Sequence, residues 1–232
     1  MTDRYIVLDT ETTGLESSDG HRIIEIGCVE IANRRLSGRT WHRYVDPERD
    51  IDEGAIQVHG LTRDMLEGKP RFADVSDDFL AFCDGAAILI HNAPFDVGFL
   101  NAEFSLLGQT NFDTGGRQII DTLAMARELH PGRRNSLDAL CDRYGISNAH
   151  RKLHGALLDA ELLADVYLAM TRGQDSLAIS AGEQERRQRD DSDGEWPPTG
   201  LAVVAVCAED LSAHEALLDA MAGDAPPLWR PG

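Results

Sequence analysis

Two carboxylates one residue apart end the first apolar run of the chain. Asp9 and Glu11 follow the run at residues 5–8, whose short length and Ile/Val content are typical of a buried central strand. Because side chains alternate along a strand, the two carboxylates lie on one face, about 6.5–7 Å apart in Cα position. They repel each other unless a cation lies between them, and such oxygen ligands suit Mg²⁺ or Mn²⁺. Taken alone, the pair also fits a strand that ends in a solvated polar turn.

Two later segments bring further groups of the same kind. Asp96 lies one helical turn into the element that follows an expected buried strand at 86–90, and Asp159 lies in an apolar helix that follows His154 and Gly155. In a parallel α/β arrangement the strand at 86–90 lies beside the first strand, so Asp96 reaches the same crevice. Positions five apart on one helix point about 140° apart, so His154 meets Asp159 only if it precedes the helix.

Four carboxylates and one histidine from three segments predict a two-cation hydrolytic site. Two divalent cations would bind the nucleophilic water and the leaving oxygen of a phosphodiester, and His154 would remove the proton. Two structural alternatives remain at this stage. Asp96 also suits the first turn of a helix as a partner of its dipole, and His154 also suits a loop histidine bonded to the backbone.

The elements that must position these groups follow an α/β order. Three strands come first, helices and strands then alternate, and helices close the domain, which predicts a mixed α/β layer sandwich. The expected strands cover the first apolar run and residues 23–34, 40–45, 86–90 and 118–121. The expected helices lie near residues 56–62, 72–83, 94–107, 123–129, 136–144 and 156–171.

Composition limits the class of protein. The chain has 232 residues and a formal net charge of -18, which fits one good-sized domain with an appendage. Its four cysteines have no paired spacing and are expected to be reduced and buried, as in a cytoplasmic protein. We find no secretory signal and no apolar run long enough for a membrane span. The negative charge opposes autonomous binding to nucleic acid, although it does not oppose a nuclease whose strand is delivered by a partner.

The composition changes after the first domain, for which we expect residues 1–173. Residues 181–200 are charged and polar, so they have little to bury and are expected to form a disordered linker. Apolar residues return in 201–232, with an expected strand at 201–207 and a helix at 211–221. A segment this short cannot build a large core alone, which predicts a partner-binding tail.

The three site segments together resemble the motifs of a known family. Asp9-Thr10-Glu11-Thr12-Thr13-Gly14, the run His91–Asp96 and the run His154–Ala160 are similar to the three motifs of the DEDDh 3′→5′ exonucleases. The likeness is greatest to the proofreading subunits of bacterial replicative DNA polymerases and extends almost to the end of the chain. It implies a ribonuclease-H-like fold, a five-stranded mixed sheet with helices on both faces. It also implies removal of mispaired 3′ nucleotides from DNA as nucleoside 5′-monophosphates.

The resemblance assigns roles to individual residues. It implies that Asp9, Glu11, Asp96 and Asp159 hold two divalent cations, Mg²⁺ or Mn²⁺, and that His154 is the general base. The implied contacts to the substrate are Asp9, Glu11, Thr12, Thr13, Val58, His59, Asn92, Phe95 and Asp159. Close relatives tend to have a glutamate five residues before His59, where this chain has Gly54 with Glu53 beside it. The resemblance therefore leaves Glu53 and Gly54 as alternatives for the contact to the 3′-hydroxyl.

Partners are implied by the same resemblance. The segment 174–180, with Gln174, Leu177 and Ile179, resembles the short peptide that docks into the sliding clamp. The tail 201–232, with Trp229 as the expected anchor, would bind the catalytic (alpha) subunit of the polymerase, and a small accessory subunit is a further expected partner. Two alternatives remain open: an exonuclease for RNA ends or short oligonucleotides, and a subunit that mainly stabilises the polymerase.

Overall fold

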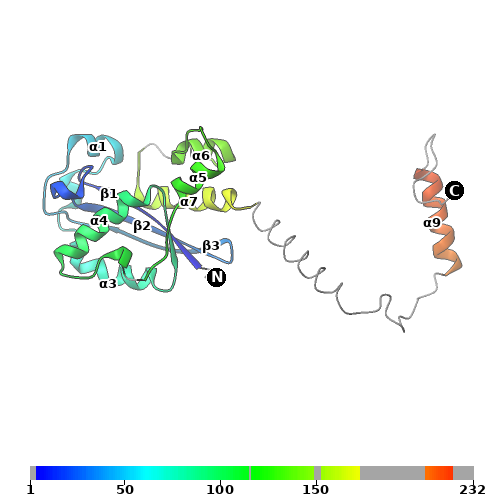
Figure 1. Ribbon diagram of the computed structural model, residues 1–232, viewed down its shortest axis with the longest axis horizontal. Helices are drawn as coiled ribbons and strands as arrows, with labels where there is room; N and C mark the ends of the chain where they lie inside the picture. Colours follow the sequence, from blue (N-terminus) through cyan, green and yellow to red (C-terminus); the bar gives the residue numbers. More distant parts are fainter. Residues whose placement is uncertain (1–3, 115, 149–152, 173–206, 222–232) are drawn as a thin grey trace. The chain divides into compact units, whose positions relative to one another are not determined.

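The computed structural model describes residues 4–114, 116–148, 153–172 and 207–221 (Figure 1). The chain divides into two compact units, Met1–Ala178 and Ile179–Gly232. The expected clamp-binding segment 174–180, the linker 181–200 and Trp229 lie outside the described residues. Within the described part, no helix has the length and apolar character needed to cross a bilayer.

The first unit is built on a five-stranded mixed sheet, as expected. The strands are β1 (Arg4–Thr12), β2 (Ile23–Ala32), β3 (Arg35–Tyr44), β4 (Ala87–Ile90) and β5 (Ile119–Asp121). Their order is β3-β2-β1-β4-β5. The three-strand meander β1–β2–β3 is antiparallel, whereas β4 pairs in parallel with β1 and β5 pairs in parallel with β4. The first strand is therefore central, and its carboxyl end lies beside that of β4.

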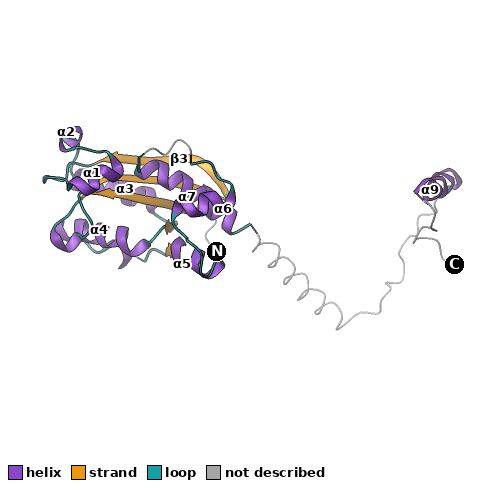
Figure 2. Ribbon diagram, turned by 90° about the horizontal axis from the view of Figure 1, so that it is seen from above, coloured by secondary structure: helices purple, strands orange, loops and turns teal. Residues whose placement is uncertain are grey.

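Helices cover both faces of this sheet (Figure 2). They are α1 (Glu53–His59), α2 (Arg63–Leu66), α3 (Phe72–Cys83), α4 (Ala93–Leu106), α5 (Thr122–Leu129), α6 (Leu137–Tyr144) and α7 (Ala156–Met170). Two short 3₁₀ helices, Ser17–Asp19 and Phe112–Thr114, and the single turn of α2 have no counterpart in the sequence prediction. Strand β3 starts at Arg35 instead of residue 40, because its exposed first half pairs with β2 and carries no apolar alternation.

The alternation of β1 divides the core in two. Ile6 and Leu8 are fully buried in a cluster with α3 and α4, and Val7 is fully buried in a second cluster with α6 and α7. The same alternation continues to the end of the strand. Asp9 and Glu11 therefore share the face that α7 covers, while Thr10 lies on the face that α4 covers.

Two helices of the first unit begin at polar side chains that cap their first turns. The carboxylate of Asp121 accepts hydrogen bonds from the amides of Leu123 and Ala124, at 2.9 and 3.3 Å. The hydroxyl of Ser136 accepts one from the amide of Ala139 at 3.4 Å, and α6 ends at Gly145 with a left-handed φ of 69°. Such caps satisfy backbone groups that a helix leaves unpaired at its ends. They fix the positions of α5 and α6, which line the cleft described below.

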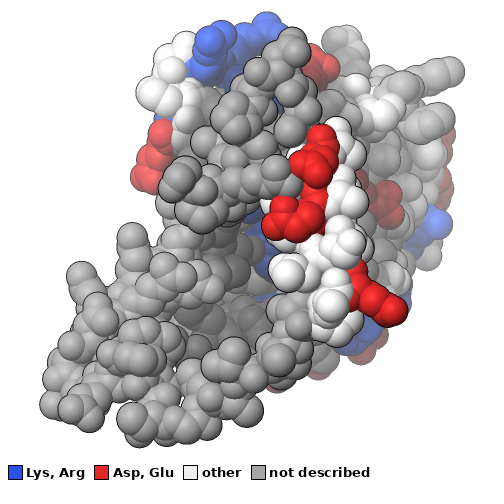
Figure 3. Space-filling view, turned by 90° about the vertical axis from the view of Figure 1, so that its right-hand side faces the viewer, with Lys and Arg blue, Asp and Glu red and all other residues white. Residues whose placement is uncertain are grey.

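The described part of the second unit is the helix α9 (Ala208–Met221). The expected helix at 211–221 is confirmed and begins three residues earlier, whereas residues 201–206 of the expected strand lie outside the described residues. Leu211 and Leu217 are exposed and Leu218 is buried. The acidic residues Glu209, Asp210, Glu215 and Asp219 give α9 the red surface seen in Figure 3. Cys207 is exposed, so the expectation that all four cysteines are buried is wrong for this one.

Candidate active site

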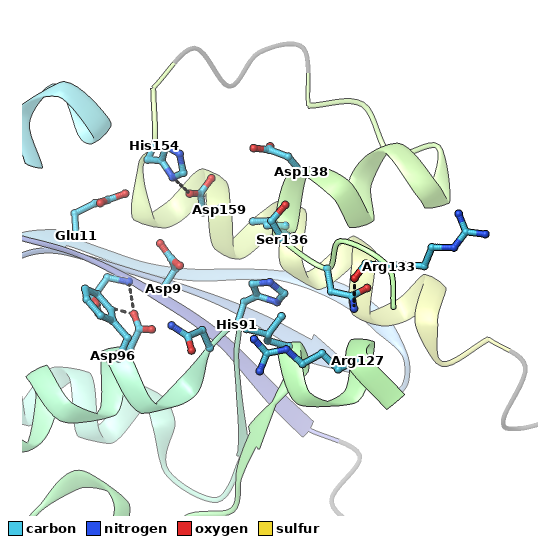
Figure 4. Close-up of a pocket in the computed structure, with 16 residues that line it drawn as sticks. Asp9, Glu11, His91, Asp96, Arg127, Arg133, Ser136, Asp138, His154 and Asp159 are labelled. Carbon is cyan, nitrogen blue, oxygen red and sulfur yellow. Dashed lines mark hydrogen bonds and ion pairs between the residues drawn. The ribbon is translucent and has the colours of Figure 1, made fainter. Parts of the chain in front are cut away.

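An open cleft of about 650 Å³ lies at the carboxyl ends of β1 and β4 (Figure 4). All five groups predicted for chemistry line it: Asp9, Glu11, Asp96, His154 and Asp159. The remaining lining residues are Thr10, His91, Asn92, Phe95, Leu123, Arg127, Arg133, Asn135, Ser136, Leu137 and Asp138. In a sheet with parallel strands, the carboxyl ends of adjacent strands form the usual crevice for a ligand.

Asp96 is held by the residue that lies between the two carboxylates of β1. The backbone amide and the hydroxyl of Thr10 both donate hydrogen bonds to Asp96 Oδ1, at 3.0 and 2.7 Å. Asp96 lies in the first turn of α4 and is only 3% exposed. Burial raises the pKa of this carboxyl to about 7, and the hydrogen bonds from Thr10 oppose the rise only in part. A buried carboxyl of this kind favours a cation that stabilises its charge.

Glu11, His154 and Asp159 form the tightest cluster of potential metal ligands in the described part of the chain. One ligand atom from each lies within 4.8 Å of the others. The ring nitrogen His154 Nδ1 is 3.2 Å from Asp159 Oδ2, although the His154 side chain is 45% exposed and that of Asp159 only 4%. Figure 4 shows Asp9 and Glu11 on the strand that faces this pair. The expectation that His154 precedes the helix and meets Asp159 is confirmed.

The position of His154 depends on α1 as well as on its own helix. Gly155 is the extended cap before α7, so the ring of His154 can turn back toward Asp159. The amide of His154 donates a hydrogen bond to the carbonyl of Val58 at 3.1 Å. Gly60, which ends α1 at a φ of +75°, leaves room for Leu153, since a Cβ there would lie 2.5 Å from its Cδ1 atom. The histidine is therefore held by a segment nearly a hundred residues earlier in the sequence.

A glycine in β2 lets α7 approach the sheet. Gly27 is the partner of Asp9 in the β1–β2 register. A Cβ at this position would lie 2.2 Å from the carbonyl carbon of Ala156 and 2.3 Å from the amide nitrogen of Leu157. Only a glycine permits so close an approach of strand and helix start. The first turn of α7 carries Asp159, so Gly27 sets the distance between the two carboxylate-bearing elements, a role that sequence analysis missed.

A second groove of about 540 Å³ adjoins the first and shares Thr10, Glu11 and Phe95 with it. Of the residues predicted to contact substrate, Thr12, Val58 and His59 line this groove, and Asn92 lines the main cleft. Glu53 and Thr13 line neither. Glu53 is exposed at the start of α1, and Gly54 takes its place in the lining. Thr13 is fully buried, and its hydroxyl pairs with His21 and with the amide of Arg22.

His59 is the buried polar residue of this second groove. The residue is 5% exposed, and its Nδ1 accepts a hydrogen bond from the amide of Leu61 at 3.0 Å. Burial lowers the pKa of His59, so the neutral ring carries its proton on the other nitrogen, Nε2. That nitrogen is buried and has no hydrogen-bond partner among the described residues. It is a donor that a bound ligand can satisfy.

Several residues of the cleft were not predicted. Arg127 comes from α5, and Arg133 and Ser136 come from the connection to α6. His91 follows β4 directly, and its Nδ1 lies 3.1 Å from the hydroxyl of Thr122. The position of His91 directly after a buried strand could have indicated it. The two arginines carry no such signal, because single arginines on a helix surface or in a loop are ordinary.

Comparisons with known proteins agree with this architecture. The sequence profile of the family described as "Exonuclease" (RNase_T) matches residues 6–167. The DNA polymerase III subunit epsilon of Escherichia coli is 48% identical over 224 residues, which cover 93% of this chain and 92% of that protein. The subunit of the same name from Pasteurella multocida is 58% identical over 179 residues, covering 75% of this chain and 70% of that protein.

Two solved structures show the same fold. Exonuclease X in complex with 5′ overhanging duplex DNA has a TM-score of 0.57 and 25% identity, covering 72% of this chain and 91% of that one. The nuclease domain of 3′hExo, a DEDDh family member bound to rAMP, has a TM-score of 0.64 and 19% identity, with 74% and 92% covered.

The sheet, the helices on both faces and the carboxylate cleft are those of a 3′→5′ exonuclease of the DEDDh class. The chain belongs to the exonuclease family and, within it, to the DNA polymerase III epsilon subunits. Membership implies divalent metal ions as cofactors and DNA as the substrate.

Proposed function

We propose that this chain removes the 3′-terminal nucleotide of DNA as a nucleoside 5′-monophosphate, as the proofreading subunit of a replicative polymerase. The observation that carries the proposal is the convergence of Glu11, His154 and Asp159, whose ligand atoms lie within 4.8 Å of one another. Asp9 and Asp96 line the same cleft. Buried carboxylates beside an exposed histidine suit hydrolysis of a phosphodiester better than they suit a purely structural role.

The donor set fits two divalent cations. Four carboxylates converge on one open cleft, and Asp96 and Asp159 are each only 3% exposed. Carboxylate oxygens are the ligands that Mg²⁺ and Mn²⁺ prefer, so we assign Asp9, Glu11, Asp96 and Asp159 as the residues that hold them. When bound, such ions supply positive charge at the attacking and leaving oxygens of the phosphodiester.

His154 is assigned as the general base. Its Nδ1 lies 3.2 Å from Asp159 Oδ2, so Asp159 orients the imidazole that would take a proton from water. The ring is half exposed, so the proton can pass from it to solvent. Asp159 then orients the base in addition to its place among the carboxylates.

The adjoining groove is assigned to the terminal nucleotide. Val58 and Phe95 offer apolar surface to a base or sugar, and His59 Nε2 offers a buried donor. The hydroxyl of Thr12 donates to the carbonyl of Gly14 at 2.7 Å and so shapes the turn at the end of β1. Glu53 does not line the groove, which disfavours a direct contact between its carboxylate and the 3′-hydroxyl.

The test is digestion of a 5′-labelled single strand, DNA or RNA, with Mg²⁺ or Mn²⁺ as the added ion. We expect stepwise shortening of DNA from the 3′ end, release of nucleoside 5′-monophosphates, and loss of activity in EDTA. The variant Asp9→Ala should lose a thousandfold or more in rate, roughly 4 kcal/mol of transition-state stabilisation. Activity that survives chelation would exclude the two-cation mechanism, and a preference for RNA would favour the alternative exonuclease.

A second part of the proposal concerns partners. We assign residues 201–232 to the catalytic subunit of the polymerase and residues 181–200 to a flexible tether in the cytoplasm. The exposure of Leu211 and Leu217 on α9 supports an apolar contact with another protein. Truncation after Ser180 should preserve nuclease activity on short strands and abolish co-purification with the polymerase subunit. Trp229→Ala should weaken the same interaction, and a truncated form that still binds tightly would refute the assignment.

The segment 174–180 is assigned to the sliding clamp, with Leu177 and Ile179 in an apolar pocket and Gln174 at its rim. This assignment rests on the sequence pattern alone. A Gln174→Ala/Leu177→Ala double variant should lose binding to the clamp while its activity on free oligonucleotides is unchanged. Capture by the clamp that is unaffected by this variant would refute the assignment. A small accessory subunit, if it covers the first unit, should co-purify with residues 1–180.

A further inference from the structure

We propose that Arg127 and Arg133 form a second subsite in the cleft, which binds the phosphates of the DNA strand upstream of the scissile bond. The inference rests on the proposed function, because it concerns the same cleft. The ligand is a phosphodiester backbone, recognised by charge and not by base sequence.

The two arginines are exceptional within this cleft. Of the described residues that line it, they are the two that carry a positive charge at neutral pH, in a chain with a net charge of -18. Both are exposed, and neither guanidinium makes a hydrogen bond or ion pair within the described residues. Several other arginines of the first unit are engaged: Arg22, for example, binds both carboxylate oxygens of Glu103 at 2.7 Å. Unused guanidinium donors match the oxygens of a phosphate.

The positions of the arginines relative to the two grooves give the strand a direction. The nucleotide groove and the main cleft share Thr10, Glu11 and Phe95, whereas Arg127 and Arg133 line the main cleft alone. Figure 4 shows Glu11 and Asp96 at one side, Asp9 nearer the middle, Arg127 beside His91, and Arg133 at the side farthest from Glu11. A strand whose 3′ nucleotide occupies the groove and whose scissile phosphate lies at the carboxylates must therefore leave toward the arginines.

The loop that carries Arg133 is ordered by its own contacts. The buried side-chain amide of Asn135 donates to the carbonyls of Arg133 and His130, at 3.2 and 3.4 Å. Arg143 donates to the side-chain oxygen of Asn135 at 3.0 Å and to the carbonyl of Arg134 at 2.7 Å. Arg127 lies on the capped helix α5, beside His91 in Figure 4. The two positive charges are thus fixed to rigid elements, as a positioning subsite requires.

The subsite also explains how so acidic a chain can bind the negatively charged backbone of DNA. Four carboxylates repel an approaching polyanion, and cations bound at the scissile phosphate act only there. Two arginines farther along the cleft attract the next phosphates and orient the strand. An acidic segment of a partner protein would satisfy the same charges, but it would not explain why they line the cleft with the carboxylates. We therefore assign them to DNA.

The experiment uses the full-length chain with Arg127→Gln and Arg133→Gln, singly and together. Arg35→Gln is the matched control, because Arg35 is exposed and lies far from the cleft. Its register partner in β2 is Ala32, which pairs with Arg4 at the amino end of β1, opposite the end that forms the cleft. The first measurement is the affinity for a labelled single-stranded decanucleotide in EDTA at several salt concentrations. The second is turnover of two substrates with Mg²⁺: the same decanucleotide and the p-nitrophenyl ester of thymidine 5′-monophosphate, which has no upstream phosphate.

We expect the double variant to bind the decanucleotide about tenfold more weakly and to have a KM about tenfold higher for it, with kcat unchanged. The slope of log affinity against log salt should fall by about 0.7 for each arginine removed. Hydrolysis of the p-nitrophenyl ester should equal that of the unsubstituted protein. Arg127→Lys, unlike Arg127→Gln, should have a salt slope close to that of the unsubstituted protein, since lysine keeps the positive charge.

Three outcomes would overturn the subsite. The double variant could match Arg35→Gln in affinity and salt slope, it could lose activity equally on both substrates, or it could keep its DNA affinity while losing an acidic protein partner. The binding measurement in EDTA is independent of catalysis. A protein that hydrolyses neither substrate would refute the proposed function, while a reduced salt slope in the double variant would still support the subsite.

Discussion

The carboxylates of the cleft and its histidine are held in opposite ways. Asp9 and Glu11 lie on the central strand and Asp159 lies on α7, so regular elements with extensive apolar packing fix them. His154 lies on the connection that precedes α7, half exposed, and its backbone amide donates a hydrogen bond to the carbonyl of Val58 in α1. The packed core therefore fixes the positions of the carboxylates, whereas a loop fixes the position of His154, the proposed proton acceptor.

This difference matches the chemistry that each group is proposed to perform. Carboxylates that hold cations gain from burial, because a low dielectric strengthens their attraction to a positive charge. A general base must release its proton to water on each cycle, which favours partial exposure. The difference also suggests that damage to the two parts will differ: loss of a carboxylate should end chemistry, while displacement of the loop should slow it.

The largest expected effect is that of Asp159→Asn. The amide keeps the shape of the side chain and removes the negative charge, so the cation site loses a charged ligand and His154 loses its anionic partner. We expect kcat on single-stranded DNA to fall about a thousandfold or more. Circular dichroism and thermal unfolding should show an intact fold. Activity within tenfold of the unsubstituted protein would mean that the core-held carboxylates are not the essential part.

His154→Ala should cost less, on the order of a hundredfold in kcat. Its exposed ring contributes little to the core, so stability should hardly change, and binding of Mn²⁺ measured by calorimetry should persist in weakened form. His214→Ala, on the exposed face of α9, is the matched control and should leave kcat unchanged. A His154→Ala protein with full turnover would show that His154 is not the general base. The contrast between carboxylates held by the core and a base held by a loop would then fail.

The sequence predicts the positions of the carboxylates on regular elements better than it predicts the contacts that hold the loop of His154. The period of β1 gives the shared face of Asp9 and Glu11, and the breaks at Gly145 and Gly155 set the bounds of α6 and α7 closely. These signals are local. The long-range contacts are not: nothing near Gly27 indicates that α7 approaches it. Likewise no pattern around Arg127 shows that its helix borders the cleft, because charge on a surface helix is ordinary.

Gly27→Ala tests whether the close packing of α7 against β2 fixes the positions of Asp159 and His154. The added Cβ would lie 2.2 Å from the backbone of Ala156, so α7 must shift and carry both Asp159 and His154 with it. We expect a loss of about 1–3 kcal/mol in unfolding free energy and a fall in kcat of tenfold or more. Gly98→Ala is the control, since its Cβ would meet only Ser17 Oγ at 3.8 Å and alanine should stabilise α4 by up to about 1 kcal/mol. Equal effects of the two changes would contradict the close-packing role of Gly27.

The smallest expected effect concerns the buried histidine, His59, in contrast to the exposed His154. Burial lowers the pKa of His59 in the folded protein below the ordinary value near 6.5, so the unfolded chain binds the proton more readily. Stability is therefore fully present above that value and is lost as pH falls through it toward the folded pKa. Urea denaturation in EDTA at pH 8 and at pH 5.5 should show this loss, and His59→Gln should reduce it. Burial lowers the pKa of His91 in the same direction, so the double variant with His91→Gln should reduce the loss further. Identical pH dependence in all three proteins would mean that these two side chains bind protons equally in the folded and unfolded states, and that burial does not lower their pKa.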